Sequence, residues 1–216
     1  GNKDPFALRR TALGLARTLI ESGFDLDLHQ LLAAAVERVG ALPTGKDGAT
    51  ASADAGELYE FVLERLKGYY ADRGVPAAHL AAVAALRPAS LYDLDRRIDA
   101  IGTFAQLPEA AALAAADKRI RNILRKADDA IPGAVDAALL REPAEAALAE
   151  AVAAAHGETG PALAQGDYVA VLTRLARLRP QVDAFFDAVM VNADDPALRG
   201  NRLALLQGLA DRLGSV

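Results

Sequence analysis

The hydrophobic and polar positions of this chain recur with the period of an α-helix along most of its length. Between residues 117 and 127, Ile120, Ile123, Leu124 and Ala127 fall on one half of a helix, and the polar positions fall on the other half. No stretch alternates with the period of two that a half-buried strand requires. The pattern therefore predicts an all-α protein of about ten helices in two packed parts.

Glycine, proline and capping residues mark the expected helix ends. The expected helices are residues 6–22, 27–39 and 56–73, a short helix after Pro76, one opened by Ser90, one from Pro108 through residue 126, and residues 142–156, 167–178, 180–192 and 196–213. We expect Asp4 and Pro5 to start the first helix. Glycine and proline within 157–161 are expected to interrupt or kink the chain, and residues 41–55 are expected to form an exposed loop.

Composition supports this fold class and narrows the environment of the protein. The 216 residues are 52% hydrophobic but only 5% aromatic, and alanine, the best helix former, is abundant. The chain has no cysteine, which excludes disulfides and thiolate metal sites and suggests a cytoplasmic location. Neither a signal peptide nor an apolar run of roughly 20 residues is present, so no membrane contact is expected. The absence of an initiator Met suggests a fragment of a longer protein.

The sequence offers no recognisable catalytic or metal-binding constellation. His29, His79 and His156 do not have metal-ligand spacing. Gly45-Lys46 opens no strand–loop–helix unit of the kind that binds phosphate, and no serine lies in a nucleophile elbow. Neighbouring carboxylates lie at expected helix boundaries, where they usually cap a helix or remain solvated. We therefore expect this chain by itself to be non-catalytic.

Residues 117–126 form a basic run on a chain whose net charge is −5. The polar residues on one half of this expected helix are Lys118, Arg119, Arg121, Asn122, Arg125 and Lys126. Arginine suits phosphates and base edges, and the amide of Asn122 offers a donor and an acceptor to a base. Because only charges within roughly 8–10 Å strongly feel a given phosphate, the acidic balance does not exclude such a contact. A solvated surface helix is the alternative, since basic residues also favour the negative end of a helix.

Two arginines near the C-terminus are further candidates for RNA contact. Arg199 and Arg202 precede the apolar part of the last expected helix, where they would form a second basic edge. The alternative is a solvated helix face, and it is slightly favoured. Arg174 and Arg177 present the same two alternatives.

Aromatic residues could stack on unpaired bases, because loop bases are recognised by stacking and by hydrogen bonds to their edges. Tyr168 is a candidate for such a contact. Core positions are favoured for Phe185 and Phe186, because Val189 and Met190 continue the same apolar pattern.

The basic run resembles the opening helix of DALR, the anticodon-binding domain of arginyl-tRNA synthetases, over Ala116-Asp-Lys-Arg-Ile-Arg-Asn-Ile-Leu-Arg-Lys-Ala127. Segments 142–145, 166–168, 182–186 and 201–206 follow in the order that this domain uses. Upstream, Lys3-Asp-Pro-Phe-Ala-Leu-Arg-Arg10 resembles the β subunit of bacterial two-subunit glycyl-tRNA synthetases. Segments 61–65, 87–88 and 185–190 resemble the same subunit, so the resemblance covers nearly the whole chain.

The resemblance implies the C-terminal part of that β subunit. In this family the α subunit activates glycine with ATP and Mg2+, and the β subunit carries most of the tRNA binding. The implied role is anticodon recognition without a cofactor in this chain. The implied partners are tRNA(Gly), the α subunit and the rest of the β subunit, and DNA is not among them. Residues 1–107 would be a helical connecting region, and residues 108–216 the anticodon-binding domain.

Two features depart from the family pattern. Asp117 stands where related sequences often carry Asn, and its charge would repel a nearby phosphate. The chain also ends soon after Leu213, short of the usual tail. A helical protein-interaction module without RNA contact is the alternative function, because the net charge is acidic and the expected helices are rich in alanine.

Overall fold

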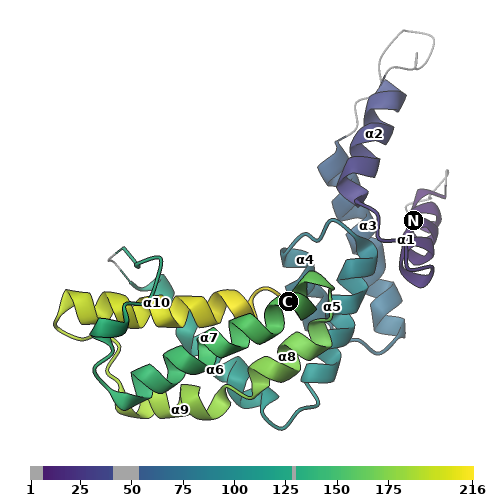
Figure 1. Ribbon diagram of the computed structural model, residues 1–216. Helices are drawn as coiled ribbons and strands as arrows, with labels where there is room; N and C mark the ends of the chain where they lie inside the picture. Colours follow the sequence, from purple (N-terminus) through teal and green to yellow (C-terminus); the bar gives the residue numbers. More distant parts are fainter. Residues whose placement is uncertain (1–6, 41–53, 128–129) are drawn as a thin grey trace. The chain divides into compact units, whose positions relative to one another are not determined.

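The computed structural model describes residues 7–40, 54–127 and 130–216 (Figure 1). All regular secondary structure within these ranges is helical, which confirms the predicted all-α class. The α-helices are α1 Leu8–Glu21, α2 Leu28–Gly40, α3 Ala55–Asp72, α4 Ala77–Ala85, α5 Leu91–Phe104, α6 Ala110–Arg125, α7 Pro143–Ala164, α8 Tyr168–Ala176, α9 Arg179–Ala188 and α10 Pro196–Leu213, with a 3-10 turn at Ala137–Leu139. The expected cap at Asp4 and Pro5 and most of the expected 41–55 loop lie outside the described residues.

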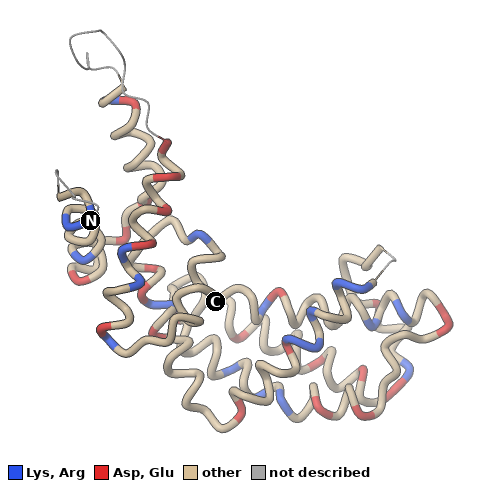
Figure 2. Tube along the Cα trace, turned by 180° about the vertical axis from the view of Figure 1, so that it is seen from behind, with Lys and Arg blue, Asp and Glu red and all other residues tan. Residues whose placement is uncertain are grey.

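The chain divides into two compact units, Gly1–Asp99 and Ala100–Val216. Ala100 is fully buried in the core of the second unit, and Ile101 and Phe104 pack against the same core. The compact unit that carries the basic run therefore begins a few residues before the domain expected at residue 108. Acidic and basic residues are interspersed along both units (Figure 2), so any basic surface must be local.

In the first unit, α3 packs against α1, α2 and α4. Its side chains Tyr59, Leu66 and Tyr70 are almost completely buried. The Tyr59 hydroxyl donates to the carbonyl of Pro88 at 2.9 Å, and the Tyr70 hydroxyl donates to Asp95 at 2.9 Å. Burial, together with the nearby Asp95 carboxylate, raises the pKa of Tyr70, so this hydroxyl keeps the proton that it donates.

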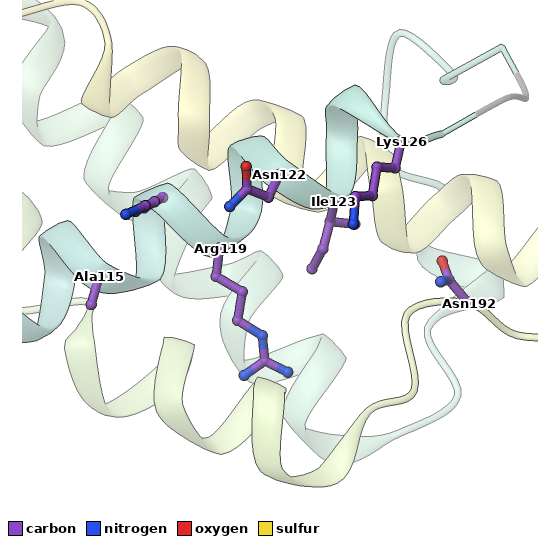
Figure 3. Close-up of a pocket in the computed structure, with 7 residues that line it drawn as sticks. Ala115, Arg119, Asn122, Ile123, Lys126 and Asn192 are labelled. Atoms are coloured by element: carbon purple, nitrogen blue, oxygen red, sulfur yellow. The ribbon is translucent and has the colours of Figure 1, made fainter.

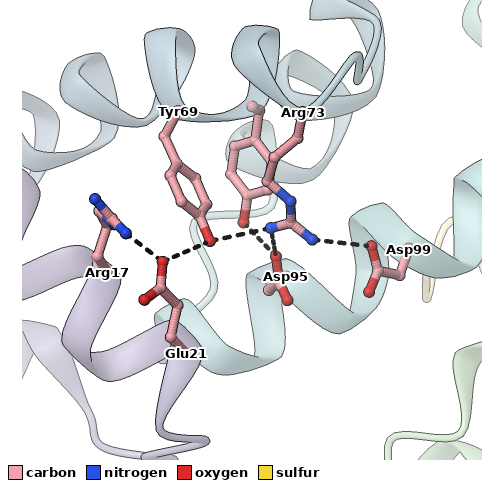
Figure 4. Close-up of polar contacts among 7 residues, drawn as sticks. Arg17, Glu21, Tyr69, Arg73, Asp95 and Asp99 are labelled. Atoms are coloured by element: carbon pink, nitrogen blue, oxygen red, sulfur yellow. Dashed lines mark hydrogen bonds and ion pairs between the residues drawn. The ribbon is translucent and has the colours of Figure 1, made fainter.

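A polar network joins α1, α3 and α5 within the first unit (Figure 4). Glu21 accepts a hydrogen bond from the Tyr69 hydroxyl at 3.4 Å, and Arg73 donates to that hydroxyl at 3.2 Å. Arg73 also pairs with Asp95 at 3.0 Å and lies 3.9 Å from Asp99. Because these groups are partly solvated, each pair contributes little to stability by itself, and the network mainly sets how the three helices meet.

In the second unit, α10 packs against both α6 and α7, while α9 packs against α6 and α7. Residues 200–206 of α10 are all buried, so this helix is surrounded on more than one side. Phe185 of α9 and Leu206 of α10 are fully buried in the same core. The predicted core position of Phe185 is therefore confirmed.

Helix α7 continues through the segment that was expected to interrupt it. The helix runs over Pro143–Ala164 and includes the glycines and the proline of residues 157–161. Thr159 is buried, and its hydroxyl donates to the carbonyl of Ala155 at 2.6 Å. Packing of this face outweighs the low helix propensity of glycine and proline. The actual break comes at Gly166, which has a positive φ of 65°.

Helix α9 ends earlier than expected, at Ala188 rather than near Asn192. Val189 has an extended backbone with φ −110° and ψ 122°. Val189 and Val191 are buried, but Met190 between them is 76% exposed. The expectation that Met190 continues an apolar helical face is therefore wrong, because side chains alternate between two faces in extended backbone.

Candidate functional site

Helix α6 presents the basic run along one side and buries the other side. Ile120 is fully buried, and Ile123 and Leu124 pack against the core of the second unit. Asn122 is half-buried, and the exposed residues are Lys118, Arg119, Arg121, Arg125 and Lys126. The helical spacing therefore predicted correctly which residues point outward, but it does not show which of them act together.

Four of the six predicted residues on α6 line a single hollow of about 460 Å3 (Figure 3). Its lining residues are Lys118, Arg119, Asn122 and Lys126 with Ala115 and Ile123, all on α6 or directly after it, and Asn192. Asn192 belongs to the loop between α9 and α10, so two segments that are distant in sequence form the walls. Sequence reasoning missed Asn192, since nothing near it in the chain resembles a binding motif.

Arg119 is held against α9 by an aromatic ring. Figure 3 shows its side chain directed from α6 toward α9, and its guanidinium carbon lies 4.0 Å from the ring centroid of Phe186. This is a cation–π contact. The half-buried Phe186 ring in turn meets Phe185 edge-on, with a centroid separation of 5.6 Å. The planar group of Arg119 therefore has a defined place beside the hollow.

The amide of Asn122 is oriented by the following turn of α6. Nη2 of Arg125 donates to Oδ1 of Asn122 at 2.7 Å. This bond uses one of the two lone pairs of the amide oxygen, so the NH2 group is the less engaged part of Asn122 and is well placed to bind a ligand. The sequence suggested both a donor and an acceptor at this position, and one hydrogen bond from Arg125 leaves both groups present.

Arg121 is directed away from the hollow and toward the end of α10. Its Nε donates to Asp117 at 2.8 Å, and its Nη2 donates to the carbonyl of Ala210 at 3.3 Å. Carbonyl groups in the last turn of a helix attract cations, so Arg121 stabilises this helix end. Arg121 therefore does not line the hollow with its neighbours, although its side chain is 53% exposed and its contact with RNA stays a prediction. By helical spacing Asp117 lies roughly opposite to the hollow, and its charge is paired.

Arg199 and Arg202 do not form the exposed basic edge that the sequence suggested. Arg202 is only 8% exposed, pairs through Nε with the Glu145 carboxylate, and donates from Nη1 to the carbonyl of Met190 at 2.8 Å. Arg199 is half-buried, and its Nη1 donates to the carbonyl of Ala193 at 2.7 Å. Both guanidinium groups thus hold the loop between α9 and α10, which forms one wall of the hollow.

Glu145 is the acceptor at the centre of this support. It is 1% exposed, and its Oε2 accepts from the N–H groups of Arg141 at 2.6 Å and Glu142 at 2.8 Å. Burial opposes its ionisation, but the Arg202 guanidinium and the two N–H groups outweigh burial and hold the pKa of Glu145 below its ordinary value. One carboxylate therefore caps α7 and fixes Arg202.

The lowered pKa of Glu145 predicts acid sensitivity of the second unit. Its contribution to stability is fully present above the ordinary value of 4.5 and is lost as the pH falls through the lower folded-state pKa. The free energy of unfolding of the wild type should exceed that of Glu145→Gln most near neutral pH, and the difference should shrink below pH 4.5. Denaturant titrations at a series of pH values measure this, and a difference independent of pH would contradict it.

Two other polar residues of the sequence motifs, Tyr168 and Asn201, are buried and have structural roles. Tyr168 is buried, so the expectation that it stacks on RNA is corrected. It follows Asp167, whose side chain caps α8. Asn201 is also buried, and its amide exchanges hydrogen bonds with the backbone of Asp136 at 2.7 and 3.0 Å. It therefore joins the segment after α6 to α10.

Two of the three histidines, His29 and His156, have contacts within the fold. His29 stacks on Tyr59 with a centroid separation of 4.1 Å, and Nε2 of His156 lies 3.2 Å from the carbonyl oxygen of Gly208. Within the described ranges, no group of three or more His, Cys, Asp or Glu side chains is arranged to hold a metal ion. In the same part of the chain, no helix has the length and apolarity needed to cross a bilayer.

Comparison with known families matches both parts of the chain. Residues 1–85 match the model of the glycyl-tRNA synthetase beta subunit, and residues 113–215 match that of the DALR anticodon binding domain. The second match includes nearly all of α6 and the loop that carries Asn192, so both walls of the hollow lie within it.

Similar proteins from three bacteria carry the same description, glycine–tRNA ligase beta subunit. The chain is 70% identical to that of Xanthomonas campestris pv. campestris (strain 8004), with 100% of this chain and 31% of that protein covered. It is 54% identical to that of Xylella fastidiosa (strain Temecula1 / ATCC 700964), covering 99% and 33%. It is 52% identical to that of Pseudomonas aeruginosa (strain LESB58), covering 97% and 30%. The chain thus spans about a third of the length of these curated relatives.

Proposed function

We propose that this chain, which belongs to the family of glycyl-tRNA synthetase beta subunits, binds tRNA through the hollow on α6 and contributes anticodon recognition. The observation that carries the proposal is the grouping of Lys118, Arg119, Asn122 and Lys126 around one hollow. Cationic side chains suit phosphates, and an amide suits a base edge.

The proposal assigns separate tasks to separate chains. Glycine activation with ATP and Mg2+ belongs to the α subunit, and tRNA(Gly) is the RNA that this chain binds. The remainder of the β subunit and the α subunit are the protein partners, in the cytoplasm. The support for a binding role is that a buried ion pair, Glu145 with Arg202, holds one wall of the hollow in place.

A titration of the chain with labelled tRNA tests this function. We expect tRNA(Gly) to bind more tightly than the same tRNA with a changed anticodon, when both are followed by fluorescence anisotropy. Affinity should fall as salt is raised, because each neutralised phosphate releases counterions, with a slope of about 0.7 per contact for single strands. Equal binding of both RNAs would exclude anticodon recognition, and binding independent of salt would exclude phosphate contacts.

A second candidate, docking of this chain onto the rest of the β subunit, rests on an observation in the first unit. Leu8 and Leu15 of α1 are 56% and 43% exposed. They line a largely apolar hollow of about 550 Å3 together with Phe61 and Val62 of α3. Such exposed apolar groups are typical of protein contacts, and the matched relatives are about three times as long as this chain. The two candidates use different units and do not exclude each other.

A further inference from the structure

We infer that the hollow on α6 holds one unstacked nucleobase, with Arg119 as its stacking surface and Asn122 as a hydrogen-bond donor to its edge. The inference rests on the proposed RNA binding and adds the ligand class and the residues that select it. A volume of about 460 Å3 lies within the range of roughly 300–1,000 Å3 of small-molecule sites. The hollow is therefore large enough for a base.

The stacking surface is the guanidinium of Arg119. One side of this planar group lies against Phe186, at 4.0 Å from the ring centroid. Arg119 is exposed and lines the hollow, so its other side is available to a ligand. Unpaired bases stack on guanidinium planes as well as on aromatic rings. The ring beneath Arg119 limits its motion, which reduces the entropy lost when a base stacks on it.

The edge of the base is recognised by carboxamides. Because Arg125 already donates to the oxygen of Asn122, the NH2 group is the more available part of this amide, and it suits an acceptor such as a base carbonyl oxygen or ring nitrogen. Asn192 supplies a second amide from the opposite wall. With one lone pair of its oxygen already used, Asn122 favours a base that presents an acceptor to its NH2 group, so this side chain can contribute to selection among bases.

The two lysines flank this base site. Lys118 and Lys126 are eight positions apart on the chain, which corresponds to roughly 12 Å along a helix, and Arg119 and Asn122 lie between them. The long, flexible lysine side chains can reach toward phosphates that flank an extruded nucleotide. The lysines would then add affinity for any RNA, while Arg119 and Asn122 would respond to the base itself.

A double-mutant cycle between protein and RNA tests the base site. The probes are fluorescein-labelled tRNA(Gly) transcripts, each lacking a single base of the anticodon loop, and the protein is the 216-residue chain. We expect removal of one particular base to weaken wild-type binding about tenfold, which is within the range for one stacked base. The same removal should cost less than about twofold in Arg119→Lys, which keeps the charge but not the plane, and in Asn122→Leu.

The controls separate this inference from the function on which it rests. Arg177→Lys changes an exposed arginine outside the hollow and should retain the full penalty for base removal. Thermal unfolding checks that each variant is folded. If Arg119→Lys and Asn122→Leu keep the same penalty as the wild type, the base site is wrong although RNA binding stands. If none of the transcripts binds the folded wild type at low salt, the proposed function itself fails.

Discussion

Replacement of Glu145 by alanine is expected to destabilise the second unit by about 3–5 kcal/mol. Arg202 would keep its charge in a buried position without its carboxylate partner. The N–H groups of Arg141 and Glu142 would also lose their acceptor at the start of α7. Denaturant unfolding followed by circular dichroism measures the change in free energy. Binding of tRNA should weaken as well, because Arg202 holds the carbonyl of Met190 in the loop that forms one wall of the hollow.

The pair Glu158–Arg174 supplies a matched control for this variant. It joins the same residue types in the same unit, but Glu158 is mostly exposed. Glu158→Ala should therefore cost no more than about 1 kcal/mol. The double variant Glu145→Ala with Arg202→Met should recover part of the loss, because no unpaired charge remains buried. An equal cost for Glu145→Ala and Glu158→Ala would contradict the structural role of the buried pair.

Charge reversal at Lys118 and Lys126 is expected to weaken binding of tRNA(Gly) by at least about 100-fold, because repulsion of phosphates replaces attraction. Both side chains are exposed, so the fold should be unaffected. The salt dependence of the remaining binding should also fall, by a slope of about 1.4 for the loss of two contacts to single-stranded RNA. Fluorescence anisotropy at several salt concentrations measures both effects.

A control of equal net charge is Lys67→Glu with Arg177→Glu, which alters two exposed residues outside the hollow. This control should lose far less affinity, because neither residue lines the hollow. If both double variants bind tRNA equally well, α6 is not the contact surface. If the variant at Lys118 and Lys126 also supports normal aminoacylation in reconstituted enzyme, docking through the first unit becomes the favoured function.

The sequence predicted the helices well where their signals are local. Spacing placed Ile120 in the core and the charged residues of α6 outside, because burial of one side of a helix follows directly from its period. Prediction failed at the ends of α7 and α9. In α7, packing around Thr159 carries the helix through a proline, and at the end of α9 the buried Arg202 binds the carbonyl of Met190 in extended backbone. Arg202 lies twelve residues from Met190 along the chain, beyond the reach of the local signals that mark a helix end.

For the candidate site, the sequence by itself determined that α6 has a cationic side and which residues lie on it. Only the tertiary structure decided which of those charges are available to a ligand. In the sequence, Arg121 and Arg202 cannot be distinguished from other basic residues. In the structure, Arg121 donates to a carbonyl near the end of α10, and Arg202 pairs with Glu145. Asn192 and Phe186 belong to the site because α9 and the loop after it lie beside α6 in the folded chain. A charged side chain is free or satisfied according to its neighbours in space, and those neighbours come from distant parts of the chain.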